Sequence, residues 1–134
     1  MSQRALILFA HGARAASWAA PFESLRELTQ ARLPDADVSL AFLELMEPSL
    51  PARVAALAAA GVDEVTVVPV FLGQGGHVLR DLPLMLDELR ASYPALRINV
   101  VGAVGEDPDV LRAMTDYCVG ALGAAGAAPE AGGV

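Results

Sequence analysis

The segment Val65–Leu72 (VTVVPVFL) is a continuous apolar run, rich in β-branched residues, that ends at the glycine-rich turn Gly73–Gly76. Apolar runs of this length without polar alternation are typical of strands buried on both faces of a parallel sheet. We therefore expect Val65–Leu72 to be the most buried strand of the protein, and the turn after it to lead into a helix. A parallel strand followed by a helix is the repeating unit of an α/β fold.

The rest of the chain repeats this alternation on both sides. The other apolar runs are Ala5–Ala10, Asp37–Leu43 and Arg97–Val101, and the helix-like segments are Trp18–Arg32, Leu50–Ala60, Leu79–Ser92 and a last one from Pro108 to about Leu122. This pattern predicts a four-stranded parallel sheet with helices on both faces, and right-handed crossovers favour a flavodoxin-like strand order of 2-1-3-4. We expect one α/β domain over residues 1–122 and a flexible tail, rich in Gly, Ala and Pro, over residues 123–134.

The composition limits the classes of partner. The 134 residues suffice for one domain with a sizeable core, and the formal net charge of −7 argues against nucleic acid or an anionic membrane as a partner. No apolar run is long enough to span a bilayer, and the first residues lack the features of a secretory signal. The one cysteine, Cys118, excludes an internal disulfide, so we expect a buried thiol and a cytoplasmic location.

The two histidines of the chain, His11 and His77, each follow the carboxyl end of a predicted strand. In an open α/β sheet the ligand crevice forms at the carboxyl ends of the strands, where the strand order reverses. With the order 2-1-3-4 this point lies between the first and third strands. Both histidines are therefore expected at one crevice, and Glu44, at the end of the second strand, is expected beside His11.

Two imidazoles and one carboxylate form a ligand set that suits Fe, Co, Ni or Zn and leaves coordination positions open. Imidazole also accepts protons near neutral pH. Each residue has a plainer interpretation, because a histidine after a strand is often a loop or capping residue and Glu44 can be a solvated acid at a helix start. The matching positions of the two histidines bring the functional interpretation level with the plainer one.

Arginines follow each histidine at a distance of three positions, Arg14 after His11 and Arg80 after His77. Together with nearby helix N-termini they offer local positive charge for an anionic substrate, although solvent-facing arginines near helix starts are common. The turn before His77 lacks the motifs of nucleotide-binding loops. Its glycines, Gly75 and Gly76 among them, are expected to let a flat ligand approach the backbone, so we count them with the two arginines as candidate substrate contacts.

Three sequence motifs of a known family occur in this chain in the same order. They lie in Leu8–Arg14, Ala41–Leu50 and Val67–Pro83. With them the chain resembles the short single-domain sirohydrochlorin chelatases, the small CbiX type of the class II chelatase superfamily, over about residues 4–122. The usual sequence of this family at the first turn is His-Gly-Ser-Arg. Ala13 replaces the serine here, which puts a hydroxyl contact in doubt but leaves the histidine in place.

The resemblance implies a lyase that inserts Co²⁺ or Fe²⁺ into sirohydrochlorin, in cobalamin or siroheme biosynthesis, without nucleotide hydrolysis. His11 and His77 would bind the metal and receive pyrrole protons, with Glu44 assisting. The resemblance further implies that no cofactor is permanently bound. It also implies a homodimer, because the short members of the family look like half of the two-domain chelatases. Two alternatives stay open, a non-catalytic metal or tetrapyrrole carrier and a nucleotide-binding regulator, and the ligand set leaves the choice among Co, Fe and Ni open.

Overall fold

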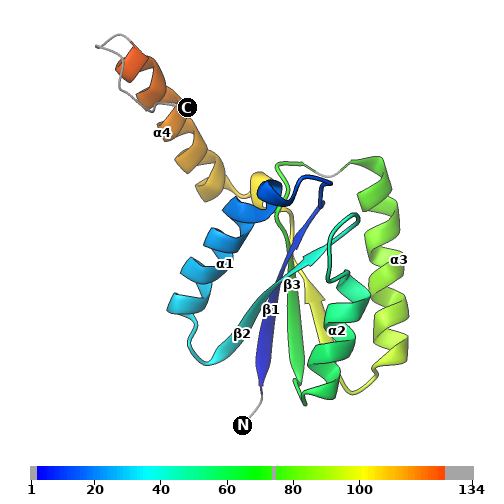
Figure 1. The fold of residues 1–134 in the computed structure, drawn as a ribbon. Helices are drawn as coiled ribbons and strands as arrows, with labels where there is room; N and C mark the ends of the chain where they lie inside the picture. Colours follow the sequence, from blue (N-terminus) through cyan, green and yellow to red (C-terminus); the bar gives the residue numbers. More distant parts are fainter. Residues whose placement is uncertain (1–2, 74, 126–134) are drawn as a thin grey trace.

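The computed structural model describes residues 3–73 and 75–125, which form one four-stranded sheet with helices around it (Figure 1). All neighbouring strands are parallel, and their order is β2-β1-β3-β4, as predicted. The strands are β1 (Arg4–Ala10), β2 (Ala36–Phe42), β3 (Glu64–Pro69) and β4 (Arg97–Val100). The order reverses between β1 and β3, so the topological switch point lies where the predicted strand order placed it.

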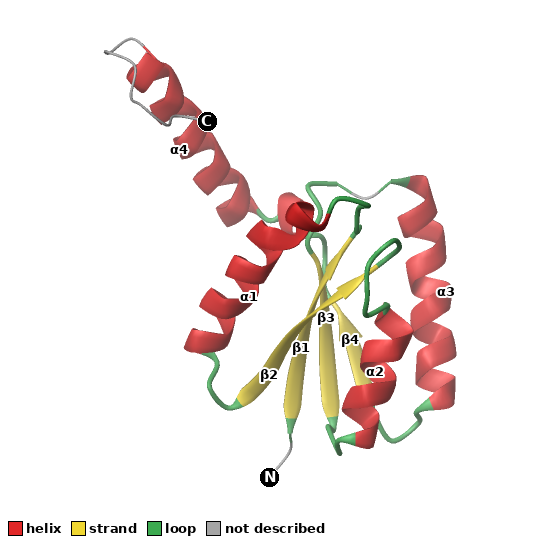
Figure 2. Ribbon diagram, in the orientation of Figure 1, coloured by secondary structure: helices red, strands yellow, loops and turns green. Residues whose placement is uncertain are grey.

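Two of the α-helices cover one face of the sheet, and one helix covers part of the other (Figure 2). The helices are α1 (Ala20–Arg32), α2 (Leu50–Ala59), α3 (Gly76–Ser92) and α4 (Pro108–Ala125), with two short 3₁₀ helices, η1 (Ala16–Ala19) and η2 (Val104–Glu106). Helices α2 and α3 lie together on one face, α1 lies on the opposite face, and α4 extends away from the sheet. None of the helices in the described residues combines the length and the apolar character that crossing a membrane requires.

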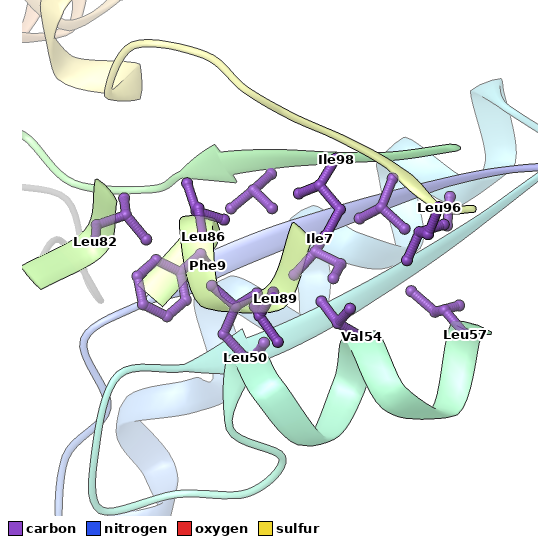
Figure 3. Close-up of a cluster of buried hydrophobic side chains, with 14 of the residues drawn as sticks. Ile7, Phe9, Leu50, Val54, Leu57, Leu82, Leu86, Leu89, Leu96 and Ile98 are labelled. Carbon is purple, nitrogen blue, oxygen red and sulfur yellow. The ribbon is translucent and has the colours of Figure 1, made fainter. Parts of the chain in front are cut away.

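The main core lies between the sheet and helices α2 and α3 (Figure 3). Ile7 and Phe9 of β1 pack there with Leu50 and Val54 of α2 and Leu86 of α3, all at most 1% exposed. A smaller cluster under α1 contains Ala10, Ala19 and Phe42, with Trp18 and Phe22 packed against it. The sheet is therefore well packed on one face and less completely on the other.

The expectation that Val65–Leu72 is the most buried strand is wrong. In β3 fully buried residues alternate with half-buried ones, whereas the last four residues of β1 are all buried. Both strands are central, so the difference arises from the face of β3 on the α1 side, which none of the helices in the described residues covers (Figure 2). The expectation of a buried thiol is wrong as well, because Cys118 lies exposed on α4.

Several boundaries differ from the predicted ones. Strand β3 ends at Pro69, although the amide of Val70 still donates to the carbonyl of Phe9 at 2.8 Å. Helix α3 begins at Gly76, three residues before the predicted start. Helix α4 reaches Ala125, three residues into the predicted tail, and residues 126–134 of that tail lie outside the described part.

Candidate functional site

The loops after β1 and β2 are joined by backbone contacts at the carboxyl edge of the sheet. The amide of Leu43 donates to the carbonyl of Ala10 at 2.8 Å, and the amide of Glu44 donates to the carbonyl of His11 at 3.0 Å. Gly12 has φ +92°, and a Cβ on it would lie 1.8 Å from the carbonyl oxygen of Glu44. Only glycine fits there, and its absent side chain lets the loops that carry His11 and Glu44 touch.

The imidazole of His11 is stacked on the ring of Phe71. The two ring centroids are 4.1 Å apart with an interplanar angle of 28°, and Phe71 itself packs on Phe9 at 5.8 Å. Phe71 is 4% exposed and His11 is half-buried. One face of the imidazole is therefore covered by a buried aromatic ring, which restrains the ring plane, while the His11 residue stays partly exposed.

Sequence reasoning misses Phe71, because it stands inside an apolar run whose pattern predicts strand throughout. The strand ends two residues earlier, and the chain then turns Phe71 toward β1. Pro69 inside the run is a signal for this, since proline is disfavoured within central strands.

Glu44 lies in an exposed loop with an unusual backbone. Leu45 has φ +66°, a left-handed conformation that costs a non-glycine residue free energy, and the amide of Met46 donates back to the carbonyl of Glu44 at 2.8 Å. The loop from Phe42 to Ser49 forms an open hollow of about 580 Å³, lined by Glu44 and Glu47 among others. The structure thus places Glu44 on an accessible loop, and a backbone hydrogen bond joins this loop to His11.

The loop after β3 leads directly into α3 at the same edge of the sheet. Gly75 is the N-cap of α3, Gly76 its first residue and His77 its second, while the side chain of His77 lies outside the described part. A Cβ added at Gly75 or Gly76 would meet no atom within 4 Å, so the space beside these glycines is open. Among the side chains that are described, no three from His, Cys, Asp and Glu lie close enough to hold a metal ion.

The two candidate arginines are exposed at this edge. Arg80 lies one turn into α3 and donates from Nε to the carbonyl of Gly76 at 3.4 Å, and Arg14 lies between β1 and η1. The ion pairs found within the described residues use other arginines. Helices α2 and α3 begin at the same edge, and their N-termini add positive potential to that of the arginines.

These features define a doubly wound α/β protein. The loops around its topological switch point carry an imidazole, a carboxylate and one arginine, and the start of α3 carries a second arginine. The chain belongs to the CbiX family, whose model matches residues 5–118.

Individual relatives agree with the family. A sirohydrochlorin cobaltochelatase from Methanopyrus kandleri is 38% identical over 82 residues, which cover 61% of this chain and 57% of that protein. A sirohydrochlorin ferrochelatase from Bacillus subtilis is 26% identical over 112 residues, which cover 84% of this chain and 43% of that protein. The chain thus spans about half the length of these curated relatives. The crystal structure of the CbiX protein from Marinobacter aquaeolei VT8 matches with a TM-score of 0.79 at 34% identity, covering 89% of this chain and 97% of that one.

Proposed function

We propose that this protein is a chelatase that inserts Co²⁺ or Fe²⁺ into sirohydrochlorin without hydrolysing a nucleotide. Membership of the CbiX family and the names of the two chelatase relatives support the reaction. The observation that carries the proposal is the His11 imidazole, held against Phe71 at the switch point and joined through its backbone to the Glu44 loop. A fixed imidazole close to an accessible carboxylate loop is a suitable open site for a metal in transit.

In the proposed reaction one divalent ion enters the macrocycle and two pyrrole N–H protons leave it. His11, His77 and Glu44 bind the incoming ion as substrate, because imidazole and carboxylate suit both cobalt and iron. The imidazoles then accept the released protons as general bases. No resident cofactor is needed, since the metal itself is consumed.

The edge around these residues suits a flat, anionic macrocycle. Leu45, Leu72 and Leu79 are all more than half exposed on the elements of this edge and offer an apolar surface to the ring. Arg14 and Arg80, with the N-termini of the helices, bind the peripheral carboxylates, and the open space at Gly75 and Gly76 admits the ring.

The proposal includes a homodimer and a cytoplasmic location. One α/β lobe covers one side of a macrocycle, so a second copy supplies the opposite side, and two-fold pairing is the commonest symmetric assembly. A lone cysteine is typical of proteins in a reducing compartment.

The activity is tested by following the absorbance of sirohydrochlorin with purified protein and Co²⁺, Fe²⁺ or Ni²⁺ in parallel. We expect multiple turnovers with cobalt or iron, and a loss of about 100-fold or more in His11→Ala and in His77→Ala, the usual size of general-base effects. Glu44→Gln should lower the rate as well, whereas Glu88→Gln, an exposed carboxylate on α3 away from the edge, should not.

Three results would contradict the proposal. Stoichiometric binding of sirohydrochlorin or metal without turnover would indicate a carrier. Insertion at the wild-type rate by both histidine variants would show that the chemistry lies elsewhere. A thermal shift with nucleotides and none with sirohydrochlorin would favour the nucleotide-binding alternative.

A further inference from the structure

Residues 101–107, here called the β4–α4 loop, connect β4 to α4 at the same carboxyl edge of the sheet as the site (Figure 1). None of these residues carries a group proposed to bind the metal or the macrocycle. Two of them are nevertheless buried, Ala103 and Gly105. A buried glycine in a connecting loop indicates that another part of the backbone approaches closely.

The close contact of Gly105 is with the backbone just after β3. Its amide donates to the carbonyl of Phe71 at 2.8 Å. A Cβ on Gly105 would lie 2.1 Å from the carbonyl oxygen of Leu72 and 2.4 Å from the Cα of Leu72. Gly105 does not have a positive φ, so glycine is needed at this position for space and not for backbone conformation. The β4–α4 loop therefore fits directly against Phe71 and Leu72.

The β4–α4 loop is held firmly on its own side of this contact. Ala103 is 2% exposed and belongs to the main core cluster, together with Phe71. The amides of Glu106 and Asp107 donate to the carbonyls of Ala103 and Val104 at 3.0 and 3.1 Å, and these bonds close the turn of η2. Gly105 therefore stands on a short turn that is anchored in the core.

The residues after β3 have less backbone support. Pairing with β1 ends at Val70, whose amide donates to the carbonyl of Phe9. Among the described residues, the amide of Gly105 makes the only backbone hydrogen bond to residues 71–73. A Cβ on Gly105 would thus meet a weakly held backbone from an anchored turn, so residues 71–73 are the ones that would have to move.

A displacement of Phe71 reaches the site directly. The ring of Phe71 is stacked on the imidazole of His11 with the centroids 4.1 Å apart. Leu72, the next residue, is 74% exposed at the surface that is proposed to receive the macrocycle. The backbone that Gly105 holds therefore carries both the ring against His11 and one of the exposed apolar side chains of the site.

We propose that Gly105 is a positioning residue, which holds the backbone of Phe71 so that the Phe71 ring orients the imidazole of His11. This role rests on the proposed function of His11 as metal ligand and base, because only then does the orientation of its ring affect the rate. Small misplacements of a reacting group are costly in rate. The β4–α4 loop thus acts on the reaction without contacting the metal or the macrocycle.

The first test follows the ring protons of the two histidines by NMR and needs no substrate. The His77→Ala variant assigns the signals of His11. We expect Gly105→Ala to shift these signals, because the Phe71 ring moves relative to the imidazole. The matched control is Gly102→Ala in the same loop, where a Cβ would meet only the carboxylate of Glu106 at 4.0 Å, so the His11 signals should stay in place. Unchanged His11 signals in folded Gly105→Ala, or equal shifts in both glycine variants, would overturn the proposal.

The second test is a double-mutant cycle on metal insertion into sirohydrochlorin. We expect Gly105→Ala and Phe71→Leu each to lower kcat by about tenfold, and the double variant to lose about tenfold as well, because both changes disturb the same stack. Effects that multiply to about a hundredfold would show that Gly105 does not act through Phe71. A wild type without turnover would contradict the proposed function, while the NMR comparison still decides whether Gly105 holds the stack.

Ala103→Gly is the second variant, in case Gly105→Ala does not fold in far-UV circular dichroism. It removes the buried methyl that anchors the β4–α4 loop and adds no atom. We expect the His11 signals to shift in the direction seen for Phe71→Leu, because a loosened η2 holds Phe71 less tightly. His11 signals that stay at the wild-type positions in folded Ala103→Gly would refute the role of the loop.

Discussion

At the scale of single residues, Gly12 is constrained in two ways at once. Its φ of +92° and the 1.8 Å that would separate an added Cβ from the carbonyl oxygen of Glu44 combine backbone strain with a backbone clash. We expect Gly12→Ala to destabilise the protein by about 3 kcal/mol, because left-handed strain and overpacking each cost about 1–3 kcal/mol. Urea unfolding measures the loss.

Gly61 provides the control for this substitution. It has φ +84°, but a Cβ added to it would meet no atom within 4 Å, so Gly61→Ala carries the strain without the clash. A loss of about 1 kcal/mol is expected for Gly61→Ala. Equal losses in the two variants would show that the contact between the His11 and Glu44 loops relaxes freely.

Phe71 is the residue whose role in the site follows from geometry alone. We expect Phe71→Leu to keep the fold and to lower kcat by about tenfold, because the imidazole of His11 loses the ring that orients it and small misplacements of catalytic groups are costly. The direct readout is NMR, since removal of a ring 4.1 Å away shifts the His11 ring protons. Phe22→Leu, in the cluster under α1, should leave those signals in place.

At the scale of elements, the turn from α1 into β2 depends on one side chain. Gln30 donates from Nε2 to the carbonyls of Leu33 and Ala36 at 2.9 and 2.8 Å, and its Oε1 accepts from the amide of Val38 at 3.0 Å. We expect Gln30→Ala to cost about 2 kcal/mol of unfolding free energy in urea titrations, since three backbone hydrogen bonds are lost and only the carbonyl of Leu33 keeps another donor, the amide of Ala36.

The exposed Glu27 on the same helix gives the comparison. Glu27→Ala should change the unfolding free energy by less than about 0.5 kcal/mol, as surface substitutions usually do. A Gln30→Ala variant as stable as Glu27→Ala would mean that water replaces all three hydrogen bonds of Gln30 without loss.

The element boundaries show where sequence patterns stop being informative. Apolar periodicity places the four strands and four α-helices, because strands and helices bury residues with different spacings. It does not place the end of β3, since Phe71 is as apolar in the site as it would be in a strand. Apolar periodicity also misses the early start of α3, because Gly76 and His77 carry no sequence signal for the beginning of a helix.

At the scale of the whole molecule, the strand order is predictable from the sequence and the position of α4 is not. The right-handed crossover rule leaves few orders for four parallel strands, and the order 2-1-3-4 is enough to bring the His11 and Glu44 loops together. Periodicity indicates that a helix exists but carries no information about which surface covers it. The direction of α4 depends on Gly105 fitting under Leu72 and on the cap by Asp107, which are tertiary contacts.

The proposed homodimer makes the stability of the protein depend on its concentration. Folding is then coupled to dimer formation, and a hundredfold increase in concentration should raise the Tm by about 4 °C. Scanning calorimetry at two protein concentrations measures the shift. A Tm that stays constant would show that no second copy stabilises the fold.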